Sequence, residues 1–387
     1  MASAEERARR EAVARVLAGQ PTAKVAADLG RSDRWVRKWV ARFDPSETGW
    51  AADRSRAPAT VANRTPAELE RVVLAVRQRL MDDPWAQVGA AAIAWELTKL
   101  GLEPPAVWTI DRILGRAGVA KRRARGRYVP KGTPYPAGRA VVQPGARQEI
   151  DLVGPRYLAG ATAFHALNAV DVGRRRCGIE ILASKEERVV AEGLVRLWRR
   201  LGVPKVAQFD NGQTLQGRGR VLALPVRLCL ALGVRVRFIP FAEPWRNGVV
   251  EHFNDVFDKR FFRTEQFHGL DHLARRAQVF EDFHNAHHRY SALHGATPAE
   301  WEARWQWTPR LLDPTFMPPT ALPRRGQIDF VRLIRSDRLL KILGVKLPVP
   351  ETLVHRYVTA TLHVRHEQLV ATCEDLWRME VPFILKP

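Results

Sequence analysis

The chain has 387 residues, 46% of them hydrophobic and 27% charged, which is the composition of a globular protein with room for about two to four domains. Its 62 Lys and Arg outnumber its 41 Asp and Glu and give a net charge of +21, so a polyanion is the expected partner, nucleic acid ahead of an anionic membrane surface. No apolar run of about 18 residues is present and residues 1–10 lack an apolar segment, which argues against a membrane span and a secretory signal.

Residues 1–45 have the spacing of a helix-turn-helix DNA-binding domain. Glu5–Leu17 is predicted as an amphipathic helix, Thr22 as the cap of a short second helix and Ser32 as the cap of a third. The third helix has an apolar face formed by Trp35, Val36, Trp39 and Val40. Its basic residues are left outside, as a helix that reads the major groove requires: Arg34, Arg37, Lys38 and Arg42. A helical bundle with a solvated basic face is the alternative.

A second helical unit is predicted at residues 65–120, after a linker at 46–64 that is rich in Pro, Ser, Ala and Arg. It opens with a capping box at Thr65–Glu68 and ends with a helix at Thr109–Ala117. In this last helix Ile110, Ile113 and Leu114 form an apolar seam, and Arg112 and Arg116 point elsewhere. We interpret the unit as a second helix-turn-helix-like domain that contacts DNA through the two arginines; a plain helical spacer is the alternative.

A basic, Pro-rich linker follows at residues 121–144. Five positive side chains stand within its first seven residues: Lys121, Arg122, Arg123, Arg125 and Arg127. A solvated linker would explain this run, but its position between two DNA-binding candidates favours an arm that follows the phosphates.

From residue 145 the hydrophobic period changes to that of an α/β domain, predicted to span 145–308. Strands are expected at 148–153, 164–171, 177–182, 205–209 and 234–239, and helices at 186–201, 219–232, 247–262, 270–289 and 298–306. Three leading antiparallel strands followed by alternating elements fit a mixed sheet flanked by helices. After a linker at 309–323, strand-like runs within residues 324–387 predict a small C-terminal β-barrel.

Three carboxylates of this domain stand beside strongly apolar runs. Asp151 lies in the first strand, Asp210 follows the strand at 205–209, and Glu251 lies near the start of the helix at 247–262. A mixed sheet can bring these positions to one edge, where carboxylate oxygens and substrate phosphate suit a pair of Mg²⁺ ions. Each acid also has an ordinary explanation: a solvent-facing strand residue, an Asp-Asn-Gly turn, and a Glu that complements the helix dipole.

The segments around these acids resemble the integrase catalytic core, which bacterial insertion-sequence transposases and retroviral integrases share. The matching segments are Gln148-Glu149-Ile150-Asp151, the Gln208–Gly212 segment QFDNG, and the Pro244–Asn254 segment PWRNGVVEHFN. The segment from His284 to Glu300 is similar to the usual end of the core in the bacterial members. The resemblance implies a ribonuclease-H-like fold and a D,D,E triad at Asp151, Asp210 and Glu251 that holds two Mg²⁺ (or Mn²⁺) ions. Bacterial relatives commonly have N-terminal helix-turn-helix units and a trailing β-barrel as well, so the resemblance covers nearly the whole chain.

One feature of the retroviral integrases is missing from this sequence, their N-terminal His/Cys zinc module. No such ligand set exists here, and no zinc is expected. The clustered His284, His287 and His288 are predicted as helix-end surface residues or as DNA-facing residues rather than ligands. The three cysteines, Cys177, Cys229 and Cys373, form no CxxC pair, which argues against a disulfide framework and favours a reducing cytoplasm.

The sequence therefore predicts a DNA transposase that hydrolyses the phosphodiester at the transposon end and then uses the freed 3′-hydroxyl to attack target DNA. Its expected partners are double-stranded DNA of transposon ends and target and further copies of itself on that DNA, with a helper ATPase as a further candidate. The expected location is the bacterial cytoplasm, with the nucleoid, and no membrane is involved. Asn211 and Asn247 are predicted to orient active-site loops or to contact DNA. Two other functions stay open: a catalytically silent DNA-binding regulator, such as a domesticated transposase, and a ribonuclease-H-like nuclease.

Overall fold

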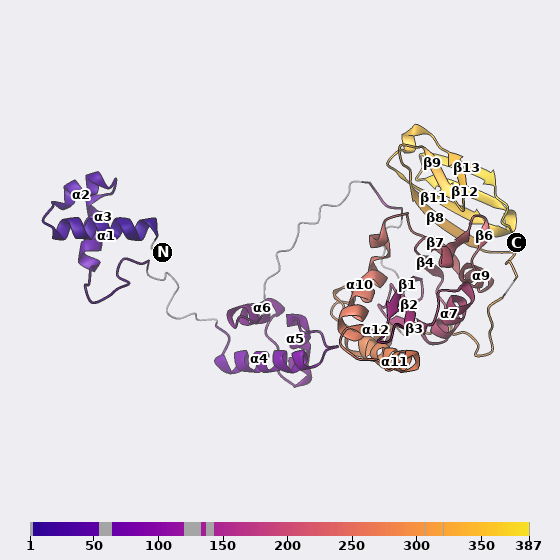
Figure 1. The fold of residues 1–387 in the computed structure, drawn as a ribbon, viewed down its shortest axis with the longest axis horizontal. Coiled ribbons are helices and arrows are strands. Elements are labelled where there is room, and N and C mark those ends of the chain that lie inside the picture. Colours follow the sequence, from indigo (N-terminus) through magenta and orange to yellow (C-terminus); the bar gives the residue numbers. More distant parts are fainter. Residues whose placement is uncertain are drawn as a thin grey trace. The chain divides into compact units, whose positions relative to one another are not determined.

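The computed structural model describes residues 3–53, 64–119, 133–136, 143–305, 307–319 and 321–386 (Figure 1). The chain divides into two compact units, Met1–Pro66 and Ala67–Pro387. In the part that is described, no helix has the length and apolarity needed to cross a membrane.

The N-terminal unit is a bundle of three helices, α1 (Ala4–Leu17), α2 (Thr22–Asp28) and α3 (Asp33–Arg42). Small side chains, Ala12, Val25 and Val36, meet at its centre, where each is fully buried. The helix-turn-helix spacing predicted from the sequence is therefore confirmed, because the apolar residues that define it do form one core.

The caps of these helices agree only partly with the sequence. Ser32 caps α3 as predicted, since its hydroxyl accepts a hydrogen bond from the backbone N–H of Trp35 at 3.2 Å. Thr22 does not cap α2: it is the first residue of that helix, and the preceding Pro21 makes no side-chain cap. The segment after α3, predicted as a linker, includes Trp50, which is buried against the same unit.

The second unit opens with three more helices, α4 (Ala67–Asp82), α5 (Ala90–Lys99) and α6 (Val107–Arg116). The predicted seam of α6 is buried among them, with Ile110, Ile113 and Leu114 at most 2% exposed. Trp85, in the connection between α4 and α5, extends away from this bundle and packs against rings of a later helix, with ring centroids 5.4 Å from Phe280 and 5.3 Å from Phe283.

The centre of the second unit is the predicted mixed sheet. Its strands are β1 (Arg147–Tyr157), β2 (Ala163–Asp171), β3 (Cys177–Leu182), β4 (Val206–Phe209) and β7 (Arg235–Phe238). The first three pair antiparallel, and β4 and β7 then add to the β1 side in parallel. Parallel pairing brings the carboxyl ends of β4 and β7 to the same edge of the sheet.

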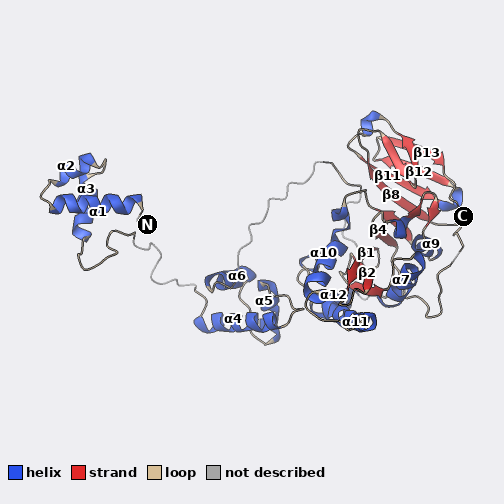
Figure 2. Ribbon diagram, in the orientation of Figure 1, coloured by secondary structure: helices blue, strands red, loops and turns tan. Residues whose placement is uncertain are grey.

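Helices cover both faces of this sheet (Figure 2). One face packs on α7 (Glu187–Leu201) and α9 (Leu224–Ala231), and the other on α10 (Gly248–Val256) and α11 (Leu270–His287). A π-helical turn, Phe257–Phe262, extends α10, and α12 (Pro298–Trp305) follows α11. Short 3-10 turns lie at Pro244–Asn247, Ser291–Leu293, Glu351–Leu353 and Val364–His366.

The helix predicted at 219–232 is shorter in the structure. A single turn, α8 (Gln213–Gln216), and a small hairpin of β5 (Gly217–Arg218) and β6 (Val221–Leu222) come before α9. Gly217 has a φ of +100°, and a Cβ there would lie 2.1 Å from the carbonyl of Val221. The turn at this glycine therefore ends α8 and begins the hairpin, and α9 starts only at Leu224, with Pro225 in its first turn.

The C-terminal strands extend the central sheet and do not form the small closed barrel predicted from the sequence. They are β8 (Gln327–Leu333), β9 (Leu339–Ile342), β10 (Val345–Pro348), β11 (Tyr357–His363), β12 (Gln368–Cys373) and β13 (Trp377–Pro382). Across the described residues the nine-stranded order is β13-β12-β11-β8-β7-β4-β1-β2-β3, and β9 and β10 form a separate hairpin. The sheet continues because β8 pairs in parallel with β7, with Phe330 opposite Phe238 and their rings stacked at 5.4 Å.

Candidate active site

Asp151 lies in the middle of β1, opposite Asn168 of β2. Its half-buried side chain faces α10, where the Asn254 amide Nδ2 donates a hydrogen bond to its Oδ2 at 2.7 Å. Burial, and then the nearby charge of Asp210, raise the pKa of the Asp151 carboxyl above its ordinary value. Asp151 is therefore a carboxylate with an oriented oxygen and a like charge beside it.

Asp210 is the first residue after β4, at the carboxyl edge of the parallel strands. Its Oδ1 accepts a hydrogen bond from the backbone N–H of Gly212 at 3.0 Å, which closes a tight turn. A Cβ on Gly212 would lie 3.1 Å from that same oxygen, so the glycine leaves room for the carboxylate in this turn. The Asp-Asn-Gly sequence is thus a turn, and it is one that holds the acid in place.

Glu251 lies in the first turn of α10 with an exposed side chain. The start of this helix is attached to β1 by Glu149, whose carboxylate accepts backbone hydrogen bonds from Val249 at 2.8 Å and Val250 at 3.3 Å. A carboxylate at a helix N-terminus is stabilised by the unpaired N–H groups there. Glu149 thereby fixes the position from which Glu251 extends.

The three carboxylates share one electrostatic environment. Partial desolvation, and then the charges of Asp151 and Asp210, raise the pKa of Glu251. Among the described residues, no Lys or Arg forms an ion pair with any of the three, although the chain carries 62 Lys and Arg. An acidic cluster left without cationic partners in so basic a protein is the kind of perturbed site that often has a function.

The donor atoms of this cluster suit a hard cation, since all are carboxylate oxygens. No group of three His, Cys, Asp or Glu side chains in the described part of the chain lies close enough to hold one metal ion together. Mg²⁺ is usually held by only one or two carboxylates together with substrate phosphates and water, so pairs of these acids would suffice. The oxygen donors of these residues therefore suit such ions chemically. That all three acids bind the same pair of ions stays a prediction.

The two asparagines singled out in the sequence hold the loops that carry the acids. Asn211 donates its side-chain amide to the carbonyl of Ile239 at 2.6 Å. The buried Asn247 accepts a hydrogen bond from the Gln208 side chain at 3.2 Å, and its own amide lies 3.4 Å from the carbonyl of Ile150. Of the two roles predicted for these residues, loop orientation is the one that these contacts support.

Two residues of the site were not identified from the sequence, Glu149 and Asn254. The sequence does contain a signal for each. Glu149 is two residues before Asp151 and shares its face of β1, and Asn254 is three residues after Glu251 and lies on the same side of α10. Their roles depend on α10 crossing β1, which the pattern of either segment alone does not reveal.

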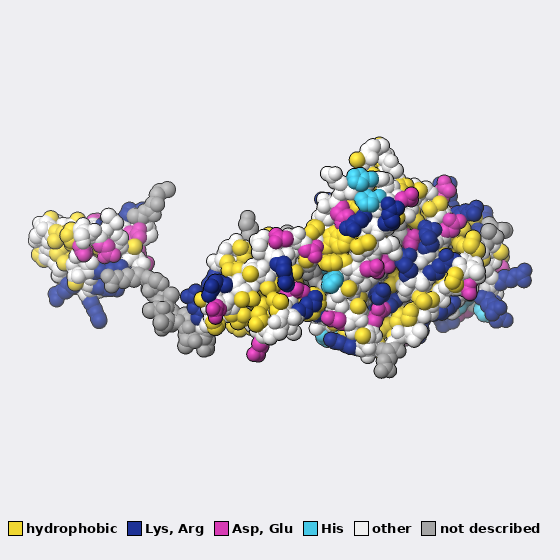
Figure 3. All heavy atoms as spheres, turned by 90° about the horizontal axis from the view of Figure 1, so that it is seen from below, with side chains coloured by type: hydrophobic (Ala, Val, Ile, Leu, Met, Phe, Trp, Pro, Cys, Tyr) yellow, Lys and Arg dark blue, Asp and Glu magenta, His cyan; other side chains and the backbone are white. Residues whose placement is uncertain are grey.

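The basic residues predicted for DNA contact on α3 are mostly exposed. Arg34, Arg37 and Lys38 are exposed; Arg37 pairs with Asp33 one turn earlier at 2.8 Å, and the Lys38 ammonium lies 5.4 Å from the centre of the Trp39 ring. On the face drawn in Figure 3, Lys and Arg side chains are interspersed with acidic and hydrophobic ones. The side chains of these three α3 residues are accessible from solvent.

Arg42 is placed differently from the other three. It is half-buried, its guanidinium lies 4.7 Å from the centre of the Trp39 ring, and it donates to the carbonyl of Ala52 at 2.8 Å. These contacts fasten the segment after α3 to the bundle, so Arg42 has a structural task whether or not it contacts DNA.

The residues predicted for DNA contact beyond α3 are only partly described. Arg112 is exposed and lies over the Trp108 ring at 5.3 Å, and Arg116 pairs with Glu70 at 2.6 Å. The basic residues of the following linker lie outside the described residues: Lys121, Arg122, Arg123, Arg125 and Arg127.

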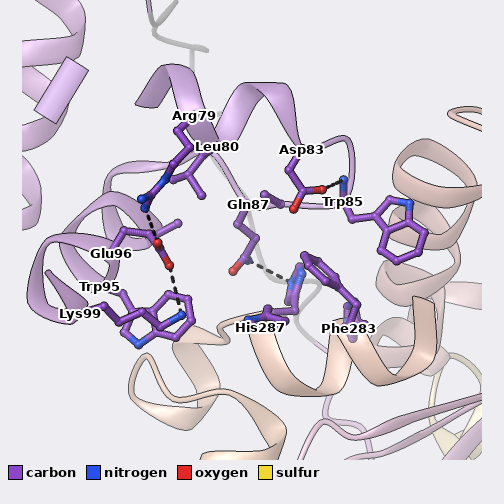
Figure 4. Close-up of a pocket in the computed structure, with 14 residues that line it drawn as sticks. Arg79, Leu80, Asp83, Trp85, Gln87, Trp95, Glu96, Lys99, Phe283 and His287 are labelled. Atoms are coloured by element: carbon purple, nitrogen blue, oxygen red, sulfur yellow. Dashed lines mark hydrogen bonds and ion pairs between the residues drawn. The ribbon is translucent and has the colours of Figure 1, made fainter. Parts of the chain in front are cut away.

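The histidines at the end of α11 form a packed group, and the prediction that His284 lies at the surface is wrong. His284 is 1% exposed, its Nε2 is 2.8 Å from the Tyr290 hydroxyl, and its ring stacks on His288 at 4.3 Å. The loop after α11 folds back over this turn and covers it. His288 in turn lies 3.1 Å from the Gln87 amide, and the exposed His287 lines a cavity of about 330 Å³ between α11 and the α4–α5 pair (Figure 4).

Comparison with known proteins identifies one domain. Residues 3–50 match the family HTH_23, described as a homeodomain-like domain. No curated protein matches the chain.

Three solved structures resemble this chain only loosely. A chain of the simian T-cell lymphotropic virus intasome in complex with the PP2A regulatory subunit B56 gamma is 15% identical, with 77% of this chain and 93% of that chain covered and a TM-score of 0.38. The HTLV-2 integrase catalytic core domain in complex with magnesium is 13% identical in its trimeric form, with 42% and 98% covered, and 14% identical in its dimeric form, with 41% and 97% covered, both at a TM-score of 0.32. What the comparisons do identify is the N-terminal unit, which is a homeodomain-like helix-turn-helix domain.

Proposed function

We propose that this chain is a DNA transposase that cleaves DNA at transposon ends and joins the freed 3′-hydroxyl to target DNA. The observation that carries the proposal is the cluster of Asp151, Asp210 and Glu251, in which burial and then neighbouring like charges raise the pKa of Asp151 and Glu251, and no described Lys or Arg pairs with any of the three. Keeping such carboxylates together has an electrostatic cost that a bound cation would relieve.

The proposed cofactor is Mg²⁺ or Mn²⁺, with two ions held by Asp151, Asp210 and Glu251. When bound, such ions activate the attacking oxygen and stabilise the leaving oxygen of an in-line displacement at phosphorus. The protein then acts mainly by positioning and by charge neutralisation.

The chain's own residues would hold the acids for this task. Asn254 orients one oxygen of Asp151, Glu149 anchors the turn of α10 that carries Glu251, and the Gly212 N–H holds Asp210. In the first step, water forms a bond to phosphorus and the 3′-oxygen at the transposon end leaves as a hydroxyl. In the second step, that hydroxyl forms the new bond to a target phosphorus and displaces the target 3′-oxygen.

Binding to double-stranded DNA would come from the two helical modules, residues 1–45 and 65–120, with residues 145–308 as the catalytic core. The homeodomain-like match at residues 3–50 and the exposed basic residues of α3 support this assignment for the first module. We further propose that the chain works as a homo-oligomer on DNA, because two transposon ends have to be joined together. The proposed location is the bacterial cytoplasm, and a helper ATPase is a candidate partner.

The test is a cleavage and strand-transfer assay on DNA that carries the inverted repeats flanking the gene, with Mg²⁺ or Mn²⁺. Asp210→Asn and Glu251→Gln should each lose cleavage by a factor of about 10³ or more and still bind the ends. Asp255→Asn is the matched control: it removes an acid from α10, one turn after Glu251, that is already paired with Lys259 at 2.6 Å. It should cleave at the wild-type rate.

The two other functions give different results in this assay. A silent regulator would bind the ends and cleave nothing in any variant. A nuclease of the ribonuclease H kind would cut RNA–DNA hybrids or junctions without regard to the inverted repeats. Cleavage retained by Asp210→Asn would contradict the catalytic role proposed for the three acids.

A further inference from the structure

Two loops bring the proposed acids to the edge of the sheet. One follows β4 and begins with Asp210 and Asn211, and the other joins β7 to α10 and leads to Glu251. Both loops are hydrogen-bonded to side chains of the C-terminal strands β8 and β11, which lie outside the predicted catalytic core.

The first connection is made by Arg332 of β8, which is 3% exposed. Its guanidinium donates to the Asn211 side-chain oxygen at 2.9 Å and to the carbonyl of Ile239 at 3.1 Å. Asn211 itself donates to that same Ile239 carbonyl. Arg332 thus joins the residue next to Asp210 to the end of β7.

The remaining contacts of Arg332 are also with uncharged groups. It donates to the carbonyls of Val331 at 2.9 Å and Lys341 at 3.1 Å, and none of the described acids forms an ion pair with it. Burial lowers the pKa of Arg332 to about 9, so it stays protonated at neutral pH. The guanidinium also lies 4.3 Å from the centre of the Phe241 ring. Even so, a buried cation without an acidic partner is expensive to keep, and an apolar side chain would fill the space at less cost. An apolar residue at this position could not make the hydrogen bond to Asn211.

The second connection is made by Tyr357 of β11. Its hydroxyl lies 2.9 Å from a carboxylate oxygen of Glu243, to which it donates, and it accepts from the Arg246 guanidinium at 2.9 Å. Arg246 also donates to Glu243 at 3.0 Å, so the three side chains close a triangle. Glu243 and Arg246 lie on either side of Pro244 and Trp245 in the loop that leads into α10, and Arg246 is five residues before Glu251.

These two residues occupy adjacent register positions of neighbouring strands and extend from opposite faces of the sheet. In the antiparallel pair of β8 and β11, Arg332 is opposite Val358 and Tyr357 is opposite Leu333. One short stretch of two neighbouring strands therefore makes the hydrogen bonds to both loops.

We propose that Arg332 and Tyr357 are positioning residues for the proposed metal-binding acids, and that the C-terminal strands β8 and β11 therefore contribute to the active site. Arg332 holds the Asn211 turn so that Asp210 faces Asp151. Tyr357 holds the start of α10 so that Glu251 faces Asp151 as well. This inference rests on the proposed function of the acids. It predicts that loss of either connection changes how the metal is used, while DNA-end binding is unaffected.

The two variants each disrupt the connection to one loop. Tyr357→Phe removes only the hydroxyl and keeps the ring, which packs edge-on against Tyr135 at 5.2 Å. Arg332→Lys keeps the charge but cannot reach Asn211 and Ile239 together. The matched control is Thr361→Val, on the same strand β11, which removes a hydroxyl that donates to the buried Asp329 at 2.8 Å and touches neither loop.

Two readouts on the full-length chain test the inference. In single-turnover end cleavage, Tyr357→Phe and Arg332→Lys should be at least about 10-fold slower and need several-fold more Mg²⁺ for half-maximal rate, with unchanged DNA binding. Without metal or DNA, hydrogen–deuterium exchange should become about 10-fold faster in peptides covering residues 240–250 for Tyr357→Phe and 208–217 for Arg332→Lys. Thr361→Val should leave both readouts at the wild-type value.

The outcomes separate this inference from the function on which it rests. A wild-type chain that cleaves nothing while exchange changes as expected would reject the transposase activity and keep the loop connections. Wild-type cleavage and Mg²⁺ dependence in both Tyr357→Phe and Arg332→Lys, or changes equal to those of Thr361→Val, would overturn the positioning role.

Discussion

Asn254 of α10 donates a hydrogen bond to Asp151 of β1 at 2.7 Å and accepts one from Asn168 of β2 at 2.9 Å. This one side chain links the helix that carries Glu251 to the strand that carries Asp151. It therefore sets the distance between two members of the proposed triad.

Asn254→Ala should slow end cleavage by about 10- to 100-fold. The reason is that a hydrogen bond to a charged group contributes about 1.5–3 kcal/mol, which is lost from the oriented state of the site. End binding should change by less than about twofold, as measured on the same DNA. Asp255→Asn, the next residue on α10, serves as the control, and equal rates for the two variants would argue that Asn254 has no part in the site.

Asp151→Asn should make the metal-free protein more stable at neutral pH. Burial and Asp210 raise the pKa of the Asp151 carboxyl, so its charged form is disfavoured in the folded state. The charged carboxylate therefore lowers the free energy of unfolding at neutral pH, and this loss is reversed as the pH falls toward the ordinary pKa of an Asp. The neutral variant should melt about 1–2 °C higher in EDTA, which corresponds to about 1 kcal/mol for a unit of this size.

The same experiment with Mg²⁺ gives the opposite order. The metal should raise the melting temperature of the wild type, because it binds the native state only, and should leave that of Asp151→Asn nearly unchanged. A variant that melts below the wild type in EDTA would show that the carboxylate stabilises the fold and is not held there at a cost.

Acid should weaken the packing of α11 against the α4–α5 pair. Burial lowers the pKa of His288 to about 3, so its imidazole is neutral in the fold, and this contribution to stability is present above the unfolded pKa near 6.5 and is lost as pH falls below it. The melting temperature should drop more steeply between pH 7 and pH 5 in the wild type than in His288→Gln. Parallel curves for the two proteins would contradict the buried, neutral imidazole.

Lys38 and Arg42 of α3 should behave differently in DNA binding. Lys38 is exposed and its ammonium lies 5.4 Å from the centre of the Trp39 ring, so Lys38→Ala should reduce the slope of log affinity against log salt concentration by about 1 and should lower stability less than Arg42→Ala does. Arg42→Ala removes the contact with the Ala52 carbonyl, and it should lower the melting temperature of the N-terminal unit. The slope comes from binding isotherms between about 50 and 200 mM salt; an unchanged slope for Lys38→Ala would exclude its contact with phosphate.

Local pattern was enough to predict most elements of the fold. The strands β1 to β3 and the helices α3, α7 and α11 follow from apolar periodicity and from caps such as Ser32, which act within a few residues. The C-terminal barrel was mispredicted because sheet order depends on pairing between distant segments. Phe238 and Phe330 are 92 residues apart, and nothing near either one indicates that β7 and β8 are neighbours.

The site shows the same division. Asp151, Asp210 and Glu251 were identified from their places in a strand, a turn and a helix start, and from the resemblance of their segments to a known core. Glu149 was missed because its partners are two backbone N–H groups of a helix 100 residues away. His284 was placed at the surface because the covering loop, which brings Tyr290 back over it, has no local signal.

The central claim is that Asp151, Asp210 and Glu251 form one site for divalent cations. Its most direct test is an anomalous difference map from crystals of the chain grown with Mn²⁺. The account predicts peaks about 2–2.5 Å from carboxylate oxygens of Asp151 and of Asp210 or Glu251, which disappear in Asp151→Asn. A map with Mn²⁺ bound only at other acids, or with no peak between these three, would contradict it.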